Sequence, residues 1–94
     1  MIRVLIERTI SESMEREFHE AQRSARQSAM TFPGYISGET LRDVANPCHH
    51  VVISTWRSAQ DWEKWAHSEE RQHLLAAISP CLDEPESDKV LEPM

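Results

Sequence analysis

The sequence predicts one α+β domain whose elements follow the order β, α, β, β, α, β. The chain has 94 residues, which suits a single domain spanning residues 1–94. Its apolar residues switch along the chain between a period of two, typical of strands, and a period near 3.6, typical of helices. Proline and glycine mark most of the places where the period changes. We therefore expect an antiparallel sheet with the helices on one of its faces.

Residues 2–10 are expected to form the first strand, because polar and apolar side chains alternate there. Ile2, Val4 and Ile6 share an apolar face that should pack on helices. The other face is mixed and suits a half-wet interface or a cavity. It carries Arg3, Leu5, Glu7 and Thr9.

Residues 11–29 are expected to form the first helix, with Ser11 or Ser13 as its cap and glutamates in its first turn. One face of this helix is apolar, with steps of three or four residues. It consists of Met14, Phe18, Ala21, Ala25 and Ala29. The helix should end before Pro33 and Gly34, which favour a turn.

Residues 35–44 and 48–56 read as two strands of an antiparallel hairpin around a turn at 45–47, with Gly38 as a candidate bulge. Ser58 and Asp61 then resemble a capping box that starts a helix carrying Trp62 and Trp65. A second helical piece should begin near residue 68 and stop at residue 80. Residues 88–93 offer a last strand at a sheet edge. This order is the ferredoxin-like arrangement.

The composition argues against several classes of partner. The net charge is −6 and the basic residues are scattered, which disfavours binding to DNA or RNA. No apolar run reaches the ~20 residues that span a bilayer, and residues 1–10 lack the uninterrupted apolar stretch of a signal peptide. Cys48 and Cys81 are interpreted as reduced thiols of a cytoplasmic protein, with a disulfide as the less favoured alternative.

A dimer is expected from the predicted layers. The helices cover one face of the sheet, and a chain of this size has nothing left to cover the other. Two copies that pair their bare sheet faces would solve this problem, and a twofold homodimer is the commonest symmetry.

Two segments give the chain a specific resemblance. One is Phe32-Pro33-Gly34-Tyr35 followed by Gly38, and the other is VVISTWRSAQDWEKWAHSEERQHL at residues 51–74. In order and spacing, the chain resembles the antibiotic biosynthesis monooxygenase family over nearly its whole length. The resemblance implies a dimeric α+β barrel with a pocket between sheet and helices in each protomer. It also implies, for some members, oxygenation of aromatic compounds with O2 and without a metal or organic cofactor.

The related heme-degrading enzymes use an asparagine, a tryptophan and a histidine. In this chain the tryptophan position is Trp65, but the asparagine position falls on Glu7 and the histidine position on Leu75. His73 lies two residues before Leu75, which turns it about 200° around a helix. The resemblance therefore argues against heme degradation, and we expect neither a cofactor nor a metal ion.

Three candidate catalytic residues remain, each with a plainer alternative. Glu7 could act as a base in a closed cavity, or it could be a carboxylate paired with an arginine such as Arg42. His50 could shuttle protons, or it and the adjacent His49, which faces the opposite side of the strand, could be one hydrogen-bonded and one solvent-facing histidine without a catalytic role. Trp65 is the tryptophan that the resemblance places in the pocket; Trp62 is expected to be core.

The pocket lining is expected to include four further residues, Phe32, Tyr35, Trp56 and Leu75. Aromatic side chains of this kind could stack on a flat ligand. The favoured function is a cofactor-independent monooxygenase acting on a small aromatic or quinone-like compound. One alternative is a non-catalytic dimeric barrel that binds a small ligand or has a stress-related role. A heme-binding or heme-degrading protein is the least favoured alternative.

Overall fold

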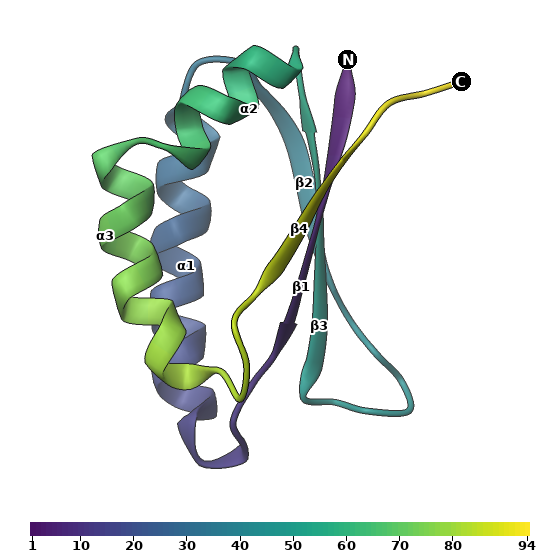
Figure 1. The fold of residues 1–94 in the computed structure, drawn as a ribbon. Coiled ribbons are helices and arrows are strands. Elements are labelled where there is room, and N and C mark those ends of the chain that lie inside the picture. The colour runs from purple at the N-terminus through teal and green to yellow at the C-terminus, as the bar shows by residue number, and fades with distance from the viewer.

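The computed structural model describes all 94 residues and has one layer of helices against one layer of strands (Figure 1). The strands are β1 (Ile2–Thr9), β2 (Tyr35–Arg42), β3 (His49–Trp56) and β4 (Ser87–Leu91). The helices are α1 (Glu15–Thr31), α2 (Ala59–Ala66) and α3 (Glu69–Ile78), and short 3₁₀ turns cover Glu12–Met14 and Ser79–Cys81. The predicted fold class and element order are confirmed.

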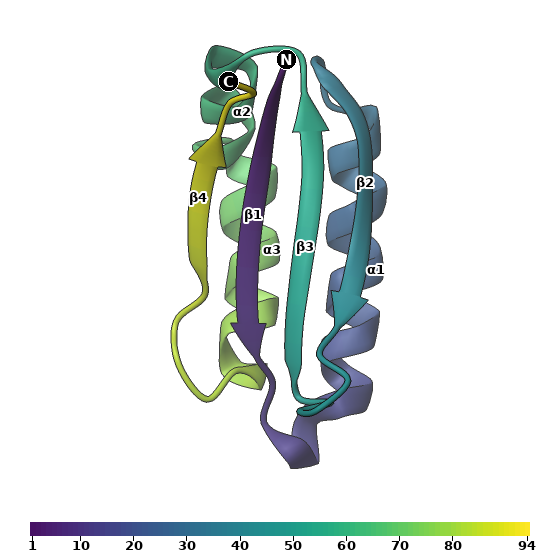
Figure 2. The same ribbon diagram turned by 90° about the vertical axis from the view of Figure 1, so that its right-hand side faces the viewer.

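The sheet is antiparallel throughout, with the strand order β2-β3-β1-β4. Figure 2 looks onto its bare face, with all three helices behind it. The last strand is at an edge as predicted, but it occupies Ser87–Leu91 instead of residues 88–93. It ends two residues before Pro93, which has no backbone N–H to donate to the ladder.

The alternation in β1 sorts its side chains between the two faces of the sheet. Ile2, Val4 and Ile6 are buried under the helices as expected. The same alternation carries Arg8 inward, where it is also buried. The odd-numbered residues of β1 lie on the bare face and are exposed or half-buried in the single chain.

The core has two clusters along the helix–sheet interface. One joins β1 to the tryptophans of β3 and α2, namely Trp56, Trp62 and Trp65. The other lies at the opposite end of the domain, where it packs α1 against the end of α3. It consists of Ile10, Phe18, Ala25, Ile78 and Cys81. Both cysteines are free, and burial raises the pKa of the Cys81 thiol.

The start of α1 differs from the prediction. A 3₁₀ turn precedes it, so the helix begins at Glu15 with Met14 as its N-cap residue, and neither serine caps it. Ser11 Oγ instead donates to Asp83 Oδ1 at 2.6 Å, which ties this turn to the loop before β4. The caps of the other two helices are serine side chains. Ser58 accepts from the N–H of Asp61, and Ser68 from the N–H of Arg71.

The expected bulge at Gly38 is also displaced. The irregularity in the β2–β3 register lies between Tyr35 and Ser37. Gly38 is regular, but a Cβ atom on it would lie 2.5 Å from the Tyr35 hydroxyl. Its missing side chain therefore makes room for the Tyr35 ring, which packs across it.

No helix in the structure is both long enough and apolar enough to cross a membrane.

Candidate functional site

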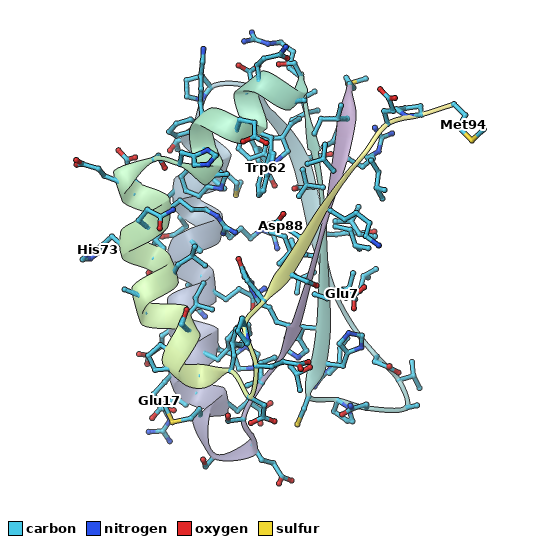
Figure 3. All side chains as sticks on the ribbon, viewed as in Figure 1. Glu7, Glu17, Trp62, His73, Asp88 and Met94 are labelled. Carbon is cyan, nitrogen blue, oxygen red and sulfur yellow. The ribbon has the colours of Figure 1, made fainter.

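A cavity of about 70 Å³ lies between the inner face of the sheet and the helices. Its aromatic lining comes from β2, β3 and α2 and consists of Tyr35, Trp56, Trp62 and Trp65. Its polar lining comes mainly from β1, α1 and α3. Figure 3 shows Trp62 pointing from α2 into the space between the two layers. We call this space the tryptophan cavity.

The aromatic rings pack on one another in fixed geometry. Trp56 contacts the other three rings. Its ring centroid lies 5.7 Å from that of Trp62 and 6.4 Å from that of Trp65. Tyr35 meets it edge-on at 5.4 Å. The Trp56 indole N–H donates to Ser54 Oγ at 3.1 Å, and this bond within β3 holds the orientation of the Trp56 ring. These contacts hold a rigid apolar wall suited to a flat ligand.

Another part of the tryptophan cavity is lined by Arg8 and Arg71, the two arginines of a buried ionic cluster. Arg8 Nε donates to Glu86 Oε2 at 2.7 Å, and an Arg71 guanidinium N–H donates to Glu86 Oε1 at 2.6 Å. The three side chains are only 4%, 5% and 11% exposed for Arg8, Arg71 and Glu86. Arg71 also lies over the Trp62 ring, with 5.5 Å between its Cζ atom and the ring centroid.

This cluster has two positive charges and one negative charge. Charges taken out of water are unfavourable unless they are paired, and one carboxylate cannot neutralise two guanidinium groups. Arg26 also lines the cavity, and Glu39 is the only acidic side chain among the lining residues. The cavity is therefore electropositive within a chain of net charge −6. It is suited to an aromatic ligand that carries or develops negative charge.

The structure places three of the four predicted lining residues around this cavity or against it. Tyr35 and Trp56 line it, as does Trp65. Phe32 lies one layer back, with its ring 5.1 Å from that of Trp65. Leu75 is half-buried on α3 and does not line the cavity. The helix carries Arg71 and Leu74 inward instead, so the prediction that Leu75 lines the pocket is wrong.

His50 is buried on the inner face but belongs to a neighbouring groove rather than to the tryptophan cavity. Its ring packs edge-on against Phe18 at 5.5 Å, and Nε2–H donates to the Pro47 carbonyl at 3.2 Å. Desolvation lowers the pKa of His50, so the neutral imidazole is favoured. Its other ring nitrogen, Nδ1, is buried and has no hydrogen-bond partner.

Glu7 is on the wrong side of the sheet for the predicted site. Figure 3 shows it on the face away from the helices. Its side chain is 48% exposed and lies 3.3 Å from His49 Nε2, so its ionic partner is a histidine and not Arg42. The reason is strand alternation, which sends Glu7 and Arg8 to opposite faces. Glu7 therefore cannot act together with His50 and Trp65.

Comparison with known proteins identifies the family. The model of the family described as antibiotic biosynthesis monooxygenase matches residues 1–77 of the chain. This chain belongs to the antibiotic biosynthesis monooxygenase family. The resemblance inferred from residues 32–38 and 51–74 is thereby confirmed.

One protein of similar sequence is a 42.8 kDa protein of the whiE locus of Streptomyces coelicolor. It is 24% identical over 86 residues, covering 92% of this chain and 22% of the relative. The chain spans about a fifth of the length of the curated relatives that it matches.

Two solved structures show the same fold at low sequence identity. A conserved protein of Methanosarcina mazei has a TM-score of 0.92 at 17% identity, covering 99% of this chain and 92% of that one. SnoaB of Streptomyces nogalater, a cofactor-independent oxygenase, has a TM-score of 0.87 at 12% identity, covering 98% and 91% of the two chains.

The ionic cluster was not predicted from the sequence, although two of its residues follow a recognisable pattern. Arg8 continues the even-numbered series of β1 that points inward. Arg71 is three and seven residues before Leu74 and Ile78, a spacing that indicates the inward face of α3. Glu86 lies in an irregular segment before β4, and no periodicity predicts where such a side chain points.

Proposed function

We propose that this protein is a cofactor-independent monooxygenase that acts on a small, electron-rich aromatic or quinone-like compound. The observation that carries the proposal is the pairing of an aromatic wall with buried, incompletely neutralised arginines in one cavity. Membership of the antibiotic biosynthesis monooxygenase family supports the same reaction class. The likeness to SnoaB agrees with this at the level of the fold.

The proposed role of the cluster is electrostatic. A phenol or anthrone that reacts with O2 does so as its conjugate base, in which the ring oxygen carries negative charge. Arg8 and Arg71 favour this anion, because preorganised cations in a dry cavity stabilise charge more strongly than water does. The tryptophans hold the ring flat and exclude water.

The reaction balances without an added reductant. An anthrone, R₂CH₂, loses a proton, and its carbanion passes electrons to O2 to form a carbon–oxygen bond and a peroxide. The peroxide takes up the proton and eliminates water, which breaks the O–O bond and leaves R₂C=O. One oxygen atom enters the product and the other leaves as water, with all electrons coming from the substrate.

The cavity must widen for such a ligand. Its volume of about 70 Å³ is smaller than the apolar cavity of about 150 Å³ that accommodates benzene in another protein. A hydrogen bond of 2.9 Å from Gln22 Nε2 to Thr40 Oγ1 joins α1 to β2 beside the cavity. This bond between half-buried side chains must break if α1 and β2 are to separate beside the cavity.

The test is O2 uptake by the purified protein with a hydroxylated anthrone. We expect saturable uptake above the spontaneous rate, together with formation of the quinone. Arg71→Met should lower this rate about 10²-fold, in line with the loss of one preorganised charge-stabilising donor. The matched control is Arg16→Gln, which lies outside the cavity and should leave the rate unchanged. Ligand binding without O2 uptake would contradict the proposal and support the non-catalytic alternative.

Heme is a poorer fit to the same cavity. No histidine is among its lining residues, and Leu75, at the position of the ligand in the heme-degrading branch, points elsewhere. Titration with hemin is therefore expected to give no specific Soret band.

We also propose that the protein is a homodimer formed through the bare face of the sheet. That face carries half-buried apolar side chains from the two central strands, Leu5, Val51 and Ile53. Its edge strands add Leu41 and Leu91, which are 45% and 43% exposed. Burial of these residues against a second copy is the expected driving force. Sedimentation equilibrium should give twice the mass of the chain, and Ile53→Lys should give the monomer.

A further inference from the structure

A second cavity, an open groove of about 400 Å³, lies between α1 and the ends of β2 and β3. Its lining is dominated by potentially cationic side chains. We call it the basic groove and define it by His19, Arg23, Arg26, Arg42 and His50. The three residues from α1 follow one another at steps of four and three, which places them on one face of the helix. Arg42 faces His50 across the β2–β3 ladder.

The arginines of the basic groove have no acidic partner. Arg23, Arg26 and Arg42 take part in none of the salt bridges of the structure, although the chain has 16 acidic residues. Like charges gathered in a groove repel one another and raise the local concentration of anions. Three exposed guanidinium groups around one groove therefore make it attractive to an anion.

His50 is a second, independent sign of a ligand. It is only 7% exposed, yet its Nδ1 atom has no hydrogen-bond partner. Buried polar atoms are nearly always paired, because an unpaired one loses its interaction with water without compensation. His50 thus adds one unsatisfied buried polar atom to a groove wall that already carries three guanidinium groups without acidic partners.

The basic groove adjoins the tryptophan cavity. Gln22, Arg26 and Thr40 line both spaces, and the hydrogen bond between Gln22 and Thr40 therefore lies at their junction. A ligand that separates these two side chains would lie in both spaces at once. Its apolar part would face the tryptophans and its charged part would face the arginines.

We propose that the ligand is an aromatic carboxylic acid, whose ring occupies the tryptophan cavity and whose carboxylate occupies the basic groove between Arg26 and Arg42. This rests on the proposed function for the position of the ring, and adds the substrate class. The carboxylate receives charge-assisted hydrogen bonds from guanidinium groups, which suit its planar, two-oxygen geometry. The same contacts give the ring one orientation in the cavity.

The test uses a matched pair of probes, 3-phenylpropanoate and its neutral amide, 3-phenylpropanamide. Binding is followed at low ionic strength through quenching of the cavity tryptophans. The acid should bind more tightly than the amide, by up to about fivefold for each exposed guanidinium that it contacts. In the R26Q/R42Q variant the affinity for the acid should fall to that for the amide, whose own affinity should not change.

Arg16→Gln is the matched control, because it removes an exposed arginine of the same helix that lines neither space. It should leave both affinities unchanged. Raising the salt concentration should weaken binding of the acid alone, since exposed charges are screened. Inorganic phosphate should compete with the acid and not with the amide.

The proposal is overturned if the acid and the amide bind equally well, if neither binds, or if R26Q/R42Q weakens both alike. The proposed oxygenase function is judged separately, by O2 uptake with an uncharged anthrone. Uptake together with equal binding of acid and amide would leave the oxygenase in place and remove the basic groove from its site.

Discussion

The two faces of the sheet carry two ionic clusters built from neighbouring residues, and they differ in almost every property. On the inner face, Arg8 and Arg71 share Glu86, and all three side chains are buried. On the bare face, His49 lies 3.3 Å from Glu7 and 3.4 Å from Asp43, with side-chain exposures of 30% to 48%. Adjacent residues of β1 thus enter environments of very different dielectric constant.

The comparison shows that position decides what a charge can do. In an exposed cluster, water and salt screen each pair, so that the pair contributes little to stability or to chemistry. In a buried cluster, each charge depends on its partner, and an excess charge acts strongly on any ligand beside it. The functional candidate is therefore the buried cluster, although the exposed Glu7 was the more conspicuous one in the sequence.

The largest expected effect is that of Glu86→Gln. This change keeps the shape of the side chain but leaves two buried guanidinium groups without a counter-charge. The free energy of unfolding should fall by about 3 kcal/mol, as for the loss of one partner from a buried ion pair. Urea denaturation of wild type and variant measures it. A loss below about 1 kcal/mol would mean that water reaches the cluster and screens it.

A double-mutant cycle on Arg8 and Glu86 should give the next largest effect. The variants are Arg8→Met, Glu86→Gln and both together, and a coupling energy of about 2 kcal/mol is expected for charges in direct contact in a buried site. The matched cycle on the bare face uses Glu7→Gln and His49→Gln in the Ile53→Lys background, in which the proposed dimer through this face is disrupted. It should give no measurable coupling, and equal couplings on the two faces would refute the comparison.

The adjacent histidines should titrate in opposite directions, because the strand sends them to opposite faces. Hydrogen bonds to Asp43 and then Glu7 raise the pKa of His49 above 6.5, and desolvation lowers that of His50 below 6.5. His19, Arg42 and Glu15 are the charged groups that act on His50. NMR titration of the imidazole signals measures both values, and shifts in the same direction would contradict the assignment of faces.

These titrations have opposite effects on stability. The contribution of His49 to the free energy of unfolding is fully present below pH 6.5 and is lost as the pH rises through the raised pKa of His49. The contribution of His50 to the free energy of unfolding is present above pH 6.5 and is lost as the pH falls through the lowered pKa of His50. The free energy of unfolding of the His50→Gln variant should therefore decline less on acidification than that of the wild type.

The smallest expected effect is that of Glu7→Gln. In the Ile53→Lys background, in which the proposed dimer is disrupted, this carboxylate is half exposed and on the opposite face of the sheet from the tryptophan cavity, so stability should change by less than about 0.5 kcal/mol. The rate of O2 uptake with an anthrone should equal that of the wild type. A lost rate in this variant would return Glu7 to the site and contradict its placement on the bare face.

Residues 32–38 and 51–74 carried enough information to predict the family, and strand and helix periodicity predicted the architecture. These are local signals: side chains alternate along any strand, and proline, glycine and serine act on their own turn of chain. Trp65 was predicted in the pocket from its position in the family pattern, and Trp56 and Tyr35 were predicted beside it as further aromatic lining. The structure places all three around one cavity.

The tertiary structure alone decided which charged residues belong to the site. Glu86 is 78 residues from Arg8, and an irregular segment brings them together. Glu7 and Arg8 differ by one residue in the sequence, but only the position of the helices buries one face of the sheet and leaves the other open in the single chain. Burial depends on what lies opposite each side chain in space, and this is why the chemistry of the site could not be predicted from its local sequence.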